Sequence, residues 1–349
     1  MKKLFTIVLM ASLVLAGCGK SESESGKRKL VISTWGLSED QLNKEVYQPF
    51  EEQFNCEIVL EKGTTSERYT KLANNPQNSK IDIIELSQAE AAKGYAANLF
   101  EMLDYSKIPN ASQLIGSAAS LSQSGYGPAY TLNSIGIIYN KEKVGFEIND
   151  WSDLWREELK NKISIPEITS TFGPAMVYVA SDYKGVDVKS DQGKAAFEAL
   201  EELKPNIVKT YSKSSDLANM FASGEITVAV VGDFGVPIVQ KVDAQAVYVN
   251  PESGTYANFN TIDIVKTSQN KDLAYEYINW RMSSELQAKN ANPATLNEAP
   301  TNQLVTLSEE FAQNKTYGEI AQKAKTIDYS FVNPLMSQWI DTWNRTLNK

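Results

Sequence analysis

The sequence predicts an α/β protein of two lobes, each a mostly parallel sheet flanked by helices, joined by a hinge. The chain has 349 residues, enough for two domains of ordinary size. Short β-type runs alternate with helical segments, which is typical of parallel sheets. A Gly-Pro break at 127–128 leads into a run rich in Ile and Tyr, which predicts a strand that crosses between the lobes. An ordinary buried strand after a turn is the alternative interpretation of this run.

The N-terminus carries the pattern of an export signal. Two lysines precede an apolar run over residues 4–15, which is too short to span a bilayer. The tetrad Leu-Ala-Gly-Cys18 then resembles the lipobox of bacterial lipoproteins, in which cleavage before the cysteine leaves it acylated. We therefore expect residues 1–17 to be a signal peptide and Cys18 to be lipidated. A signal peptide that happens to have a cysteine after the cut is the alternative.

A polar segment follows the cysteine. Residues 19–29 contain no apolar side chain, so they cannot contribute to a core and are predicted to be a flexible tether. The lipidated Cys18 and this tether form the region 18–29. They would hold the folded part at the extracytoplasmic face of the cell membrane.

Composition excludes several function classes. The chain has no histidine and a net charge of −9. Imidazole-based catalysis and imidazole metal sites are therefore excluded, and a nucleic-acid partner is not expected. Cys56 is the second of two cysteines, so no internal disulfide forms if Cys18 is lipidated. We expect no enzymatic activity, no cofactor and no metal.

The elements can be placed in chain order. Strands are predicted at 30–34, 56–61, 81–85, 163–166, 226–231, 244–249 and 256–265. Helices are predicted from about Ser38, whose Ser-Glu-Asp-Gln start is typical of an N-cap, and at 65–74, 90–97, from Trp151, 193–203, 215–223, 273–282 and 308–349. Trp339 and Trp343 lie four residues apart, which predicts one apolar face packed on a lobe.

Polar residues cluster where strands end. Trp35 follows the first strand, and in open α/β sheets the carboxyl ends of strands face the ligand. Ser87 follows the third strand. The hydroxyl-rich run 169–171 precedes Gly173 and Pro174, which predicts a helix start whose free N–H groups point into a cleft.

The order of several short motifs resembles a known family. These motifs are Ser33-Thr-Trp-Gly, Asp82-Ile-Ile-Glu-Leu-Ser, Gly127-Pro-Ala-Tyr through Ile138-Tyr-Asn, Trp151-Ser-Asp-Leu-Trp, Phe221-Ala-Ser-Gly-Glu-Ile and Asn270-Lys-Asp-Leu-Ala-Tyr. They are similar to the solute-binding proteins of ABC importers, in the spermidine/putrescine-binding subgroup.

The resemblance implies a periplasmic-binding-protein-like fold of type II that closes by hinge bending around a solute. It also implies delivery of the solute to an ABC permease by a monomer. With it, residues 30–131 and 260–302 are expected to form lobe 1. Residues 132–259 and 303–349 are expected to form lobe 2.

The resemblance also bears on the ligand. Trp35 and Ser87 match the family's aromatic and polar positions, whereas Asn260 and the run 169–171 fall where polyamine binders carry carboxylates, and Val231 falls near an aromatic position. Candidate ligand-binding residues are Trp35, Ser87, Tyr130, Thr169, Thr171, Asp233, Asn258 and Asn260. We expect a small polar solute with at most one positive charge. Glu85, Glu167 and Asp233 could replace the missing acids, so a polyamine stays open.

Two other function classes stay open. A surface adhesin or interaction lipoprotein would use the same anchor without needing a polar cleft. An enzyme on the same two-lobe fold is a further alternative, although the chain has no nucleophile elbow and no phosphate-binding loop.

Overall fold

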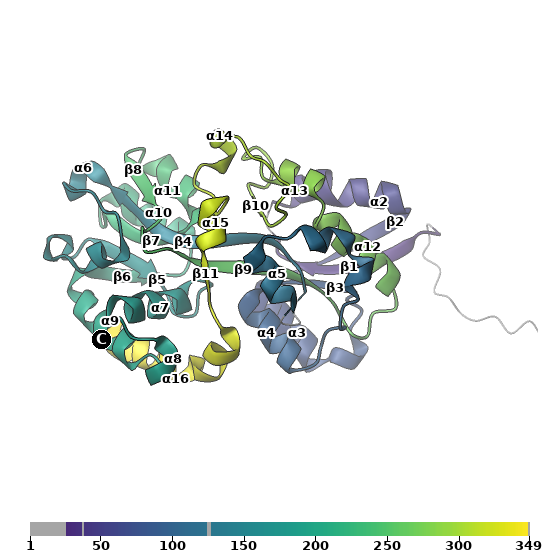
Figure 1. Cartoon of the computed structure of the whole chain (residues 1–349), viewed down its shortest axis with the longest axis horizontal. Coiled ribbons are helices and arrows are strands. Elements are labelled where there is room, and N and C mark those ends of the chain that lie inside the picture. The colour runs from purple at the N-terminus through teal and green to yellow at the C-terminus, as the bar shows by residue number, and fades with distance from the viewer. Residues whose placement is uncertain (1–25, 37, 124–126, 348–349) are drawn as a thin grey trace, which may run out of the picture.

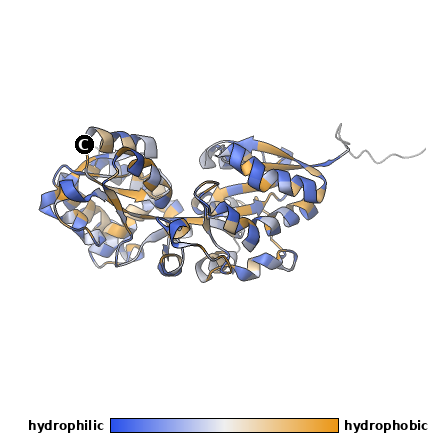
Figure 2. Cartoon of the chain, turned by 90° about the horizontal axis from the view of Figure 1, so that it is seen from above, coloured by the Kyte–Doolittle hydropathy of each residue, from blue (hydrophilic) through white to orange (hydrophobic). Residues whose placement is uncertain are grey.

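The computed structural model describes residues 26–36, 38–123 and 127–347. The predicted signal peptide, Cys18 and most of the tether lie outside these residues. Figure 1 shows two lobes side by side with strands running between them, and Figure 2 shows the same lobes from above, joined by a narrower middle. The two-lobe α/β fold predicted from the sequence is confirmed.

The first lobe is built on three parallel strands. β1 (Arg28–Thr34) lies between β2 (Cys56–Lys62) and β3 (Ile83–Ser87). Its helices are α1 (Glu39–Leu42), α2 (Gln48–Phe54), α3 (Thr65–Asn74), α4 (Gln88–Ala96), α5 (Gly116–Gln123), α12 (Lys271–Arg281) and α13 (Ser284–Asn290). β1 begins at Arg28, two residues before the predicted start, because Arg28 and Lys29 pair with Cys56 and Glu57.

The second lobe repeats this arrangement. β5 (Ile163–Pro166) lies parallel to β6 (Ile207–Tyr211) and β7 (Val228–Gly232), and β8 (Ala246–Val249) lies beside the long crossing strand. Its helices are α6 (Lys141–Val144), α7 (Gly173–Tyr183), α8 (Val188–Asp191), α9 (Lys194–Leu203), α10 (Ser214–Ser223), α11 (Val236–Val242) and α16 (Tyr329–Leu347). β6 was not predicted from the sequence, because a short strand of mixed polarity carries little periodic signal.

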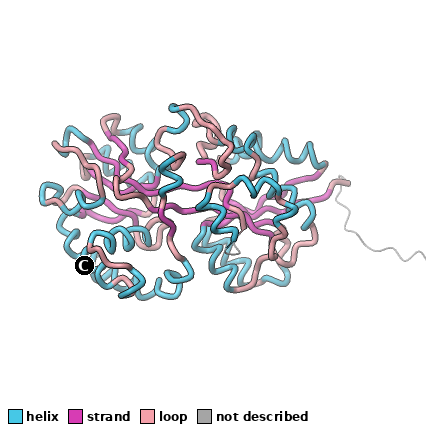
Figure 3. The backbone as a smooth tube through the Cα atoms, in the orientation of Figure 1, coloured by secondary structure: helices cyan, strands magenta, loops and turns pink. Residues whose placement is uncertain are grey.

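Two antiparallel strands connect the lobes. β4 (Ala129–Asn140) pairs with β9 (Tyr256–Ile264) over its first half and with β7 and β8 over its second half. The main strand order is β2-β1-β3-β9-β4-β7-β5-β6, and Figure 3 shows this continuous run of strands through both lobes. β4 is therefore the predicted crossing. It is also buried almost throughout, so the alternative interpretation as a buried strand describes the same residues.

Each lobe has its own hydrophobic core. Phe50, Phe259 and Tyr277 lie in the core of the first lobe. Trp339 and Trp343 are buried in the core of the second lobe, as their spacing predicted. The helical face that carries them packs on the lobe rather than facing solvent.

Three local predictions are corrected. Ser38 does not cap the first helix with its side chain, because its backbone is left-handed, and a π-helical turn (Asn43–Tyr47) interrupts the run before α2. The segment from Trp151 is a short 3₁₀ helix (Trp151–Trp155) rather than an α-helix. The region 308–349 is not one helix, since α14 (Glu309–Ala312), α15 (Glu319–Lys323) and the short strand β11 (Lys325–Thr326) precede α16. Positive φ angles at Asn314 and Gly318 break the helical run.

Candidate functional site

A cavity of about 720 Å³ lies between the lobes. It collects side chains that follow the carboxyl ends of parallel strands in both lobes, which is where open α/β sheets bind ligands. The first lobe contributes Trp35, Thr64, Thr65, Ser66, Ser87, Glu90 and Lys93. The second lobe contributes Thr169, Ser170, Thr171, Phe172, Tyr211, Ser212, Ser214, Phe234 and Tyr329.

Trp35 is held in one orientation. Its indole N–H donates to Thr65 Oγ1 at 2.9 Å, and the guanidinium carbon of Arg68 lies 4.6 Å from the ring centroid. Arg68 is itself buried and fixed by backbone carbonyls, since its Nη1 donates to Glu85 O at 2.6 Å and its Nε donates to Gly63 O at 3.0 Å. The indole is thus a fixed wall of the cavity.

The start of α3 forms the neighbouring wall. Thr64 Oγ1 accepts from Glu67 N at 3.3 Å, and Glu67 Oε2 accepts from Thr64 N at 2.9 Å, which together form a capping box. The hydrogen bonds that the Glu67 carboxylate accepts from the backbone N–H and the hydroxyl of Thr64 lower the pKa of Glu67. The cap fixes where Thr64, Thr65 and Ser66 face the cavity.

The start of α4 contributes the charged groups of the lining. Glu90 accepts from Ser87 Oγ at 2.7 Å and from Ser66 Oγ at 3.4 Å, and it lies 3.5 Å from Lys93 Nζ. Ser87 also lines the cavity, and its hydroxyl proton is directed to Glu90. The carboxylate already has three polar partners.

The loop before α7 contributes polar side chains to the cavity wall. Thr169 and Thr171 are exposed to the cavity, while Ser170 turns back to donate to Glu167 O at 2.7 Å. α7 begins at Gly173, as predicted, and a Cβ at that position would lie 2.2 Å from Glu167 O. Only glycine lets the loop fold this closely onto the helix start.

Aromatic rings close the second-lobe wall. Phe172 and Phe234 stack with centroids 6.1 Å apart and planes 19° apart. Gly232 makes room for both, since a Cβ there would lie within 2.7 Å of either ring. Phe234 is 51% exposed, so its ring is available to a bound solute. Neither phenylalanine was predicted from the sequence, although both lie beside predicted strand or helix ends.

The lobes already touch at the helical side of the cavity. Asn333 on α16 donates from Nδ2 to Ala89 O at 3.0 Å, and Gln88 Nε2 donates to Ile327 O at 3.2 Å. Ala92 of α4 packs with the second-lobe core. These contacts join α4 to the C-terminal segment.

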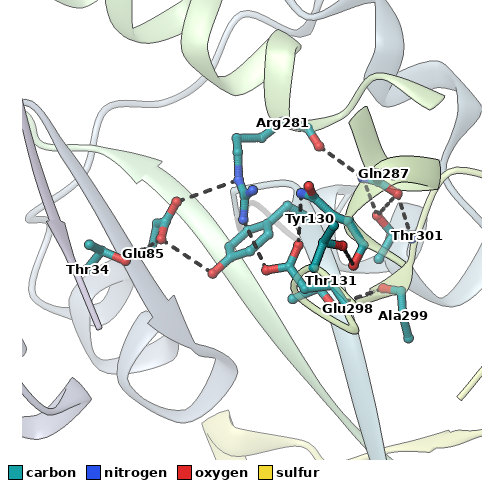
Figure 4. Close-up of polar contacts among 11 residues, drawn as sticks. Thr34, Glu85, Tyr130, Thr131, Arg281, Gln287, Glu298, Ala299 and Thr301 are labelled. Atoms are coloured by element: carbon teal, nitrogen blue, oxygen red, sulfur yellow. Dashed lines mark hydrogen bonds and ion pairs between the residues drawn. The ribbon is translucent and has the colours of Figure 1, made fainter. Parts of the chain in front are cut away.

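Behind the cavity lies a buried ionic network, drawn in Figure 4. Glu85 accepts from Thr34 Oγ1 at 2.6 Å and from the Tyr130 hydroxyl at 3.4 Å, and it lies 3.8 Å from Arg281 Nε. The Arg281 guanidinium stacks over Tyr130 at 4.2 Å and pairs with Glu298 at 3.4 Å. Burial raises the pKa of Tyr130, and the charge of Glu85 adds to the rise. The network ties β3, β4 and α12 together at the hinge.

The other sequence candidates lie on or near the hinge strands. Asn260 pairs with Ser87 across β3 and β9, next to the cavity wall, and accepts from Asn258 Nδ2 at 3.2 Å. Asp233 is buried and accepts from Thr316 N at 3.0 Å and from Phe234 N at 2.8 Å. Burial raises the pKa of Asp233 to about 6.

The structure thus divides the eight candidates. Trp35, Ser87, Thr169 and Thr171 line the cavity together. The remaining four do not line it in this conformation: Tyr130, Asp233, Asn258 and Asn260. The missed lining residues include the starts of α3 and α4, the two phenylalanines, the segment at the end of β6, which was not predicted, and residues on α16, which reaches the cavity from far along the chain.

No metal or membrane-spanning feature is found in residues 26–36, 38–123 and 127–347. These residues contain no group of three or more acidic or cysteine side chains placed to hold a metal ion. None of their helices combines the length and apolar character needed to cross a bilayer. Cys56 is a buried free thiol.

The comparisons with known proteins agree with this geometry. A family described as bacterial extracellular solute-binding protein matches residues 45–319. A crystal structure of an ABC transporter protein from Clostridium perfringens is 57% identical and covers 91% of this chain and 100% of its own, with a TM-score of 0.87.

More distant relatives are also similar over most of the chain. Spermidine/putrescine-binding periplasmic protein 1 from Haemophilus influenzae is 26% identical over 270 residues, which are 70% of this chain and 72% of the relative. The spermidine/putrescine substrate-binding protein PotD from Streptococcus pneumoniae is 20% identical. Its structure covers 90% of this chain and 98% of its own, and has the same fold, with a TM-score of 0.74.

The family resemblance seen in the sequence motifs is confirmed, and with it the prediction that the chain is not an enzyme, since this family and its structural neighbours are transport proteins. The chain belongs to the bacterial extracellular solute-binding proteins, the substrate-binding components of ABC transporters.

Proposed function

We propose that this chain captures a small polar solute between its lobes and delivers it to an ABC permease in the cytoplasmic membrane. The observation that carries the proposal is the cavity itself, which takes side chains from both lobes, while the paired strands β4 and β9 connect those lobes. Bending of β4 and β9 would bring the two walls together around a solute. Capture and delivery leave the solute chemically unchanged.

The predicted lobes and anchor are part of this proposal. Lobe 1 would comprise residues 30–131 and 260–302, and lobe 2 would comprise 132–259 and 303–349. Lipidated Cys18 and the tether would hold a monomer at the extracytoplasmic face of the membrane. Export and tethering would keep the cavity close to the permease.

Trp35, Ser87, Thr169 and Thr171 are proposed to contact the solute, because all four line the cavity. Asn258 and Asn260 on β9 would reach it when the lobes close. Tyr130 and Asp233 would set the hinge geometry behind it, since both are buried and hydrogen-bonded there. A polyamine, which the name of the Haemophilus relative suggests, is one candidate solute.

Native mass spectrometry tests capture. The full-length protein, purified in detergent without denaturation, should retain one small molecule per chain. That molecule, once identified, is titrated by calorimetry into wild type, Trp35→Ala and Trp35→Phe. Loss of the indole should weaken binding by more than about 1 kcal/mol, while Phe should recover part of the loss. If no tested small molecule binds, the transport role is wrong.

Membrane fractionation tests the anchor. Wild type should partition with membranes after export, whereas Cys18→Ala should lose this partition, because it has no thiol to acylate. Equal membrane association of both after signal cleavage would contradict the lipidation.

A further inference from the structure

The second-lobe wall of the cavity carries no charge. Every described residue that lines it between 166 and 340 is uncharged. Glu167, Lys213 and Asp233 lie next to lining residues in sequence, but none of them lines the cavity. The carboxylate of Glu167 accepts from Thr210 Oγ1 at 3.0 Å, and that of Asp233 accepts from Thr316 N at 3.0 Å. A diamine that spans the cavity would place one ammonium group against this wall. Enclosing a charge without a partner is strongly unfavourable.

The first-lobe wall has no free negative charge to offer either. Glu90 is the one acidic residue among the described residues that line the cavity. Its side chain is 13% exposed and already engages Ser87, Ser66 and Lys93. The charges of Glu90 and Lys93 cancel, so an ammonium group would have to displace Lys93 to gain a partner.

Trp35 is also unsuited to bind a cation. The guanidinium of Arg68 occupies one face of the indole at 4.6 Å, and its hydrogen bonds go to the backbone carbonyls of Gly63, Ser33 and Glu85. A second cation on the opposite face would meet a ring already polarised towards Arg68 and would be repelled by it. The neutral C–H face of a sugar or polyol has no such penalty, so it can stack there.

Hydroxyl groups supply the remaining polar lining. Thr169 and Thr171 are exposed to the cavity, and their hydroxyls bond no other residue in the described part of the chain. Ser212 and Ser214 lie on the same wall. Hydroxyls donate to and accept from ligand oxygens without requiring a ligand charge.

We propose that the cavity selects an oxygen-rich solute without net positive charge, such as a sugar, polyol or sugar acid, and discriminates against diamines and polyamines. The inference rests on the proposed function, because it specifies the ligand class of the same cavity. Three features support the proposal together. The second-lobe wall is uncharged, Lys93 neutralises the charge of Glu90, and the guanidinium of Arg68 covers one face of Trp35.

Thr171→Asp tests the charge argument with a matched control. Thr171 is exposed, so both Thr171→Asp and Thr171→Asn should fold, and the two variants differ only in charge. Calorimetry of the full-length protein in detergent measures putrescine and spermidine affinity for each. Thr171→Asp should bind putrescine at least about tenfold more tightly than Thr171→Asn, because it supplies the missing carboxylate. Equal affinities would overturn the inference.

Wild-type screening separates this inference from the proposed function. Thermal shift at about 1 mM should show no stabilisation by putrescine or spermidine, and stabilisation by maltose, inositol or gluconate. Maltose and inositol are uncharged and gluconate is a sugar acid, so the three probes separate these two kinds of solute. Strong stabilisation by spermidine would leave the transport role intact and overturn the charge class. Retention of no small molecule, with no response to any probe, would count against the transport role itself.

Discussion

Asp263 is expected to make the protein less stable as the pH rises. Its side chain on β9 is fully buried and accepts from Gly127 N and Thr261 Oγ1, each at 3.0 Å, and from the Tyr95 hydroxyl. Burial raises its pKa from an ordinary value of 3.8 to about 6, although these hydrogen bonds oppose the rise. The carboxyl therefore binds its proton more tightly in the folded protein than in the unfolded chain.

The direction and size of this pH dependence follow from the linkage between proton binding and folding. Because the folded pKa is higher, the stabilisation is fully present below the unfolded pKa and is lost as the pH rises through the folded pKa. A gap of about 2 pKa units corresponds to about 3 kcal/mol, of which about 2 kcal/mol is lost between about pH 4 and pH 7. Asp233, whose pKa is also raised to about 6 by burial, adds a loss of the same sign.

Urea unfolding of wild type and Asp263→Asn measures the effect. Asn keeps an acceptor oxygen and cannot ionise. The unfolding free energy of the variant should therefore rise by about 2 kcal/mol relative to that of wild type between about pH 4 and pH 7. Comparing the two proteins cancels titration at other sites. A difference in unfolding free energy that stays constant across this range would refute the reasoning.

Three further substitutions test the site and the core by chemical denaturation. Gly173→Ala should destabilise by about 1–3 kcal/mol, since its Cβ would lie 2.2 Å from Glu167 O, while Gly116→Ala, with open space around it, should change stability little. Thr64→Ala should cost about 1 kcal/mol by removing the cap of α3, and Thr64→Ser should restore it; equal losses would exclude the cap. Trp343→Ala should cost about 3–5 kcal/mol because the indole is fully buried, and Trp343→Phe should cost less.

The sequence by itself determined the fold class and much of the element order. Helix 65–74 and strand 163–166 have the predicted bounds, and α10 ends at Ser223, where the predicted helix 215–223 ends, with Gly224 following in a left-handed conformation. These features are encoded locally, by hydrophobic period, caps and strand-end residues. A strand end placed Trp35 at the cleft, a helix start placed Thr169 and Thr171 there, and the family resemblance added Ser87. The structure brings these four residues to one cavity.

Only the tertiary structure decided what surrounds those residues. Arg68 lies 33 positions from Trp35 in sequence, and its placement against the indole depends on how α3 packs on β1. Likewise, Asp233 is next in sequence to Phe234, which lines the cavity, but the Asp233 carboxylate does not line it. That carboxylate accepts from the backbone N–H of Thr316 instead. Charge balance in a cavity depends on contacts between distant segments, which local sequence patterns do not encode.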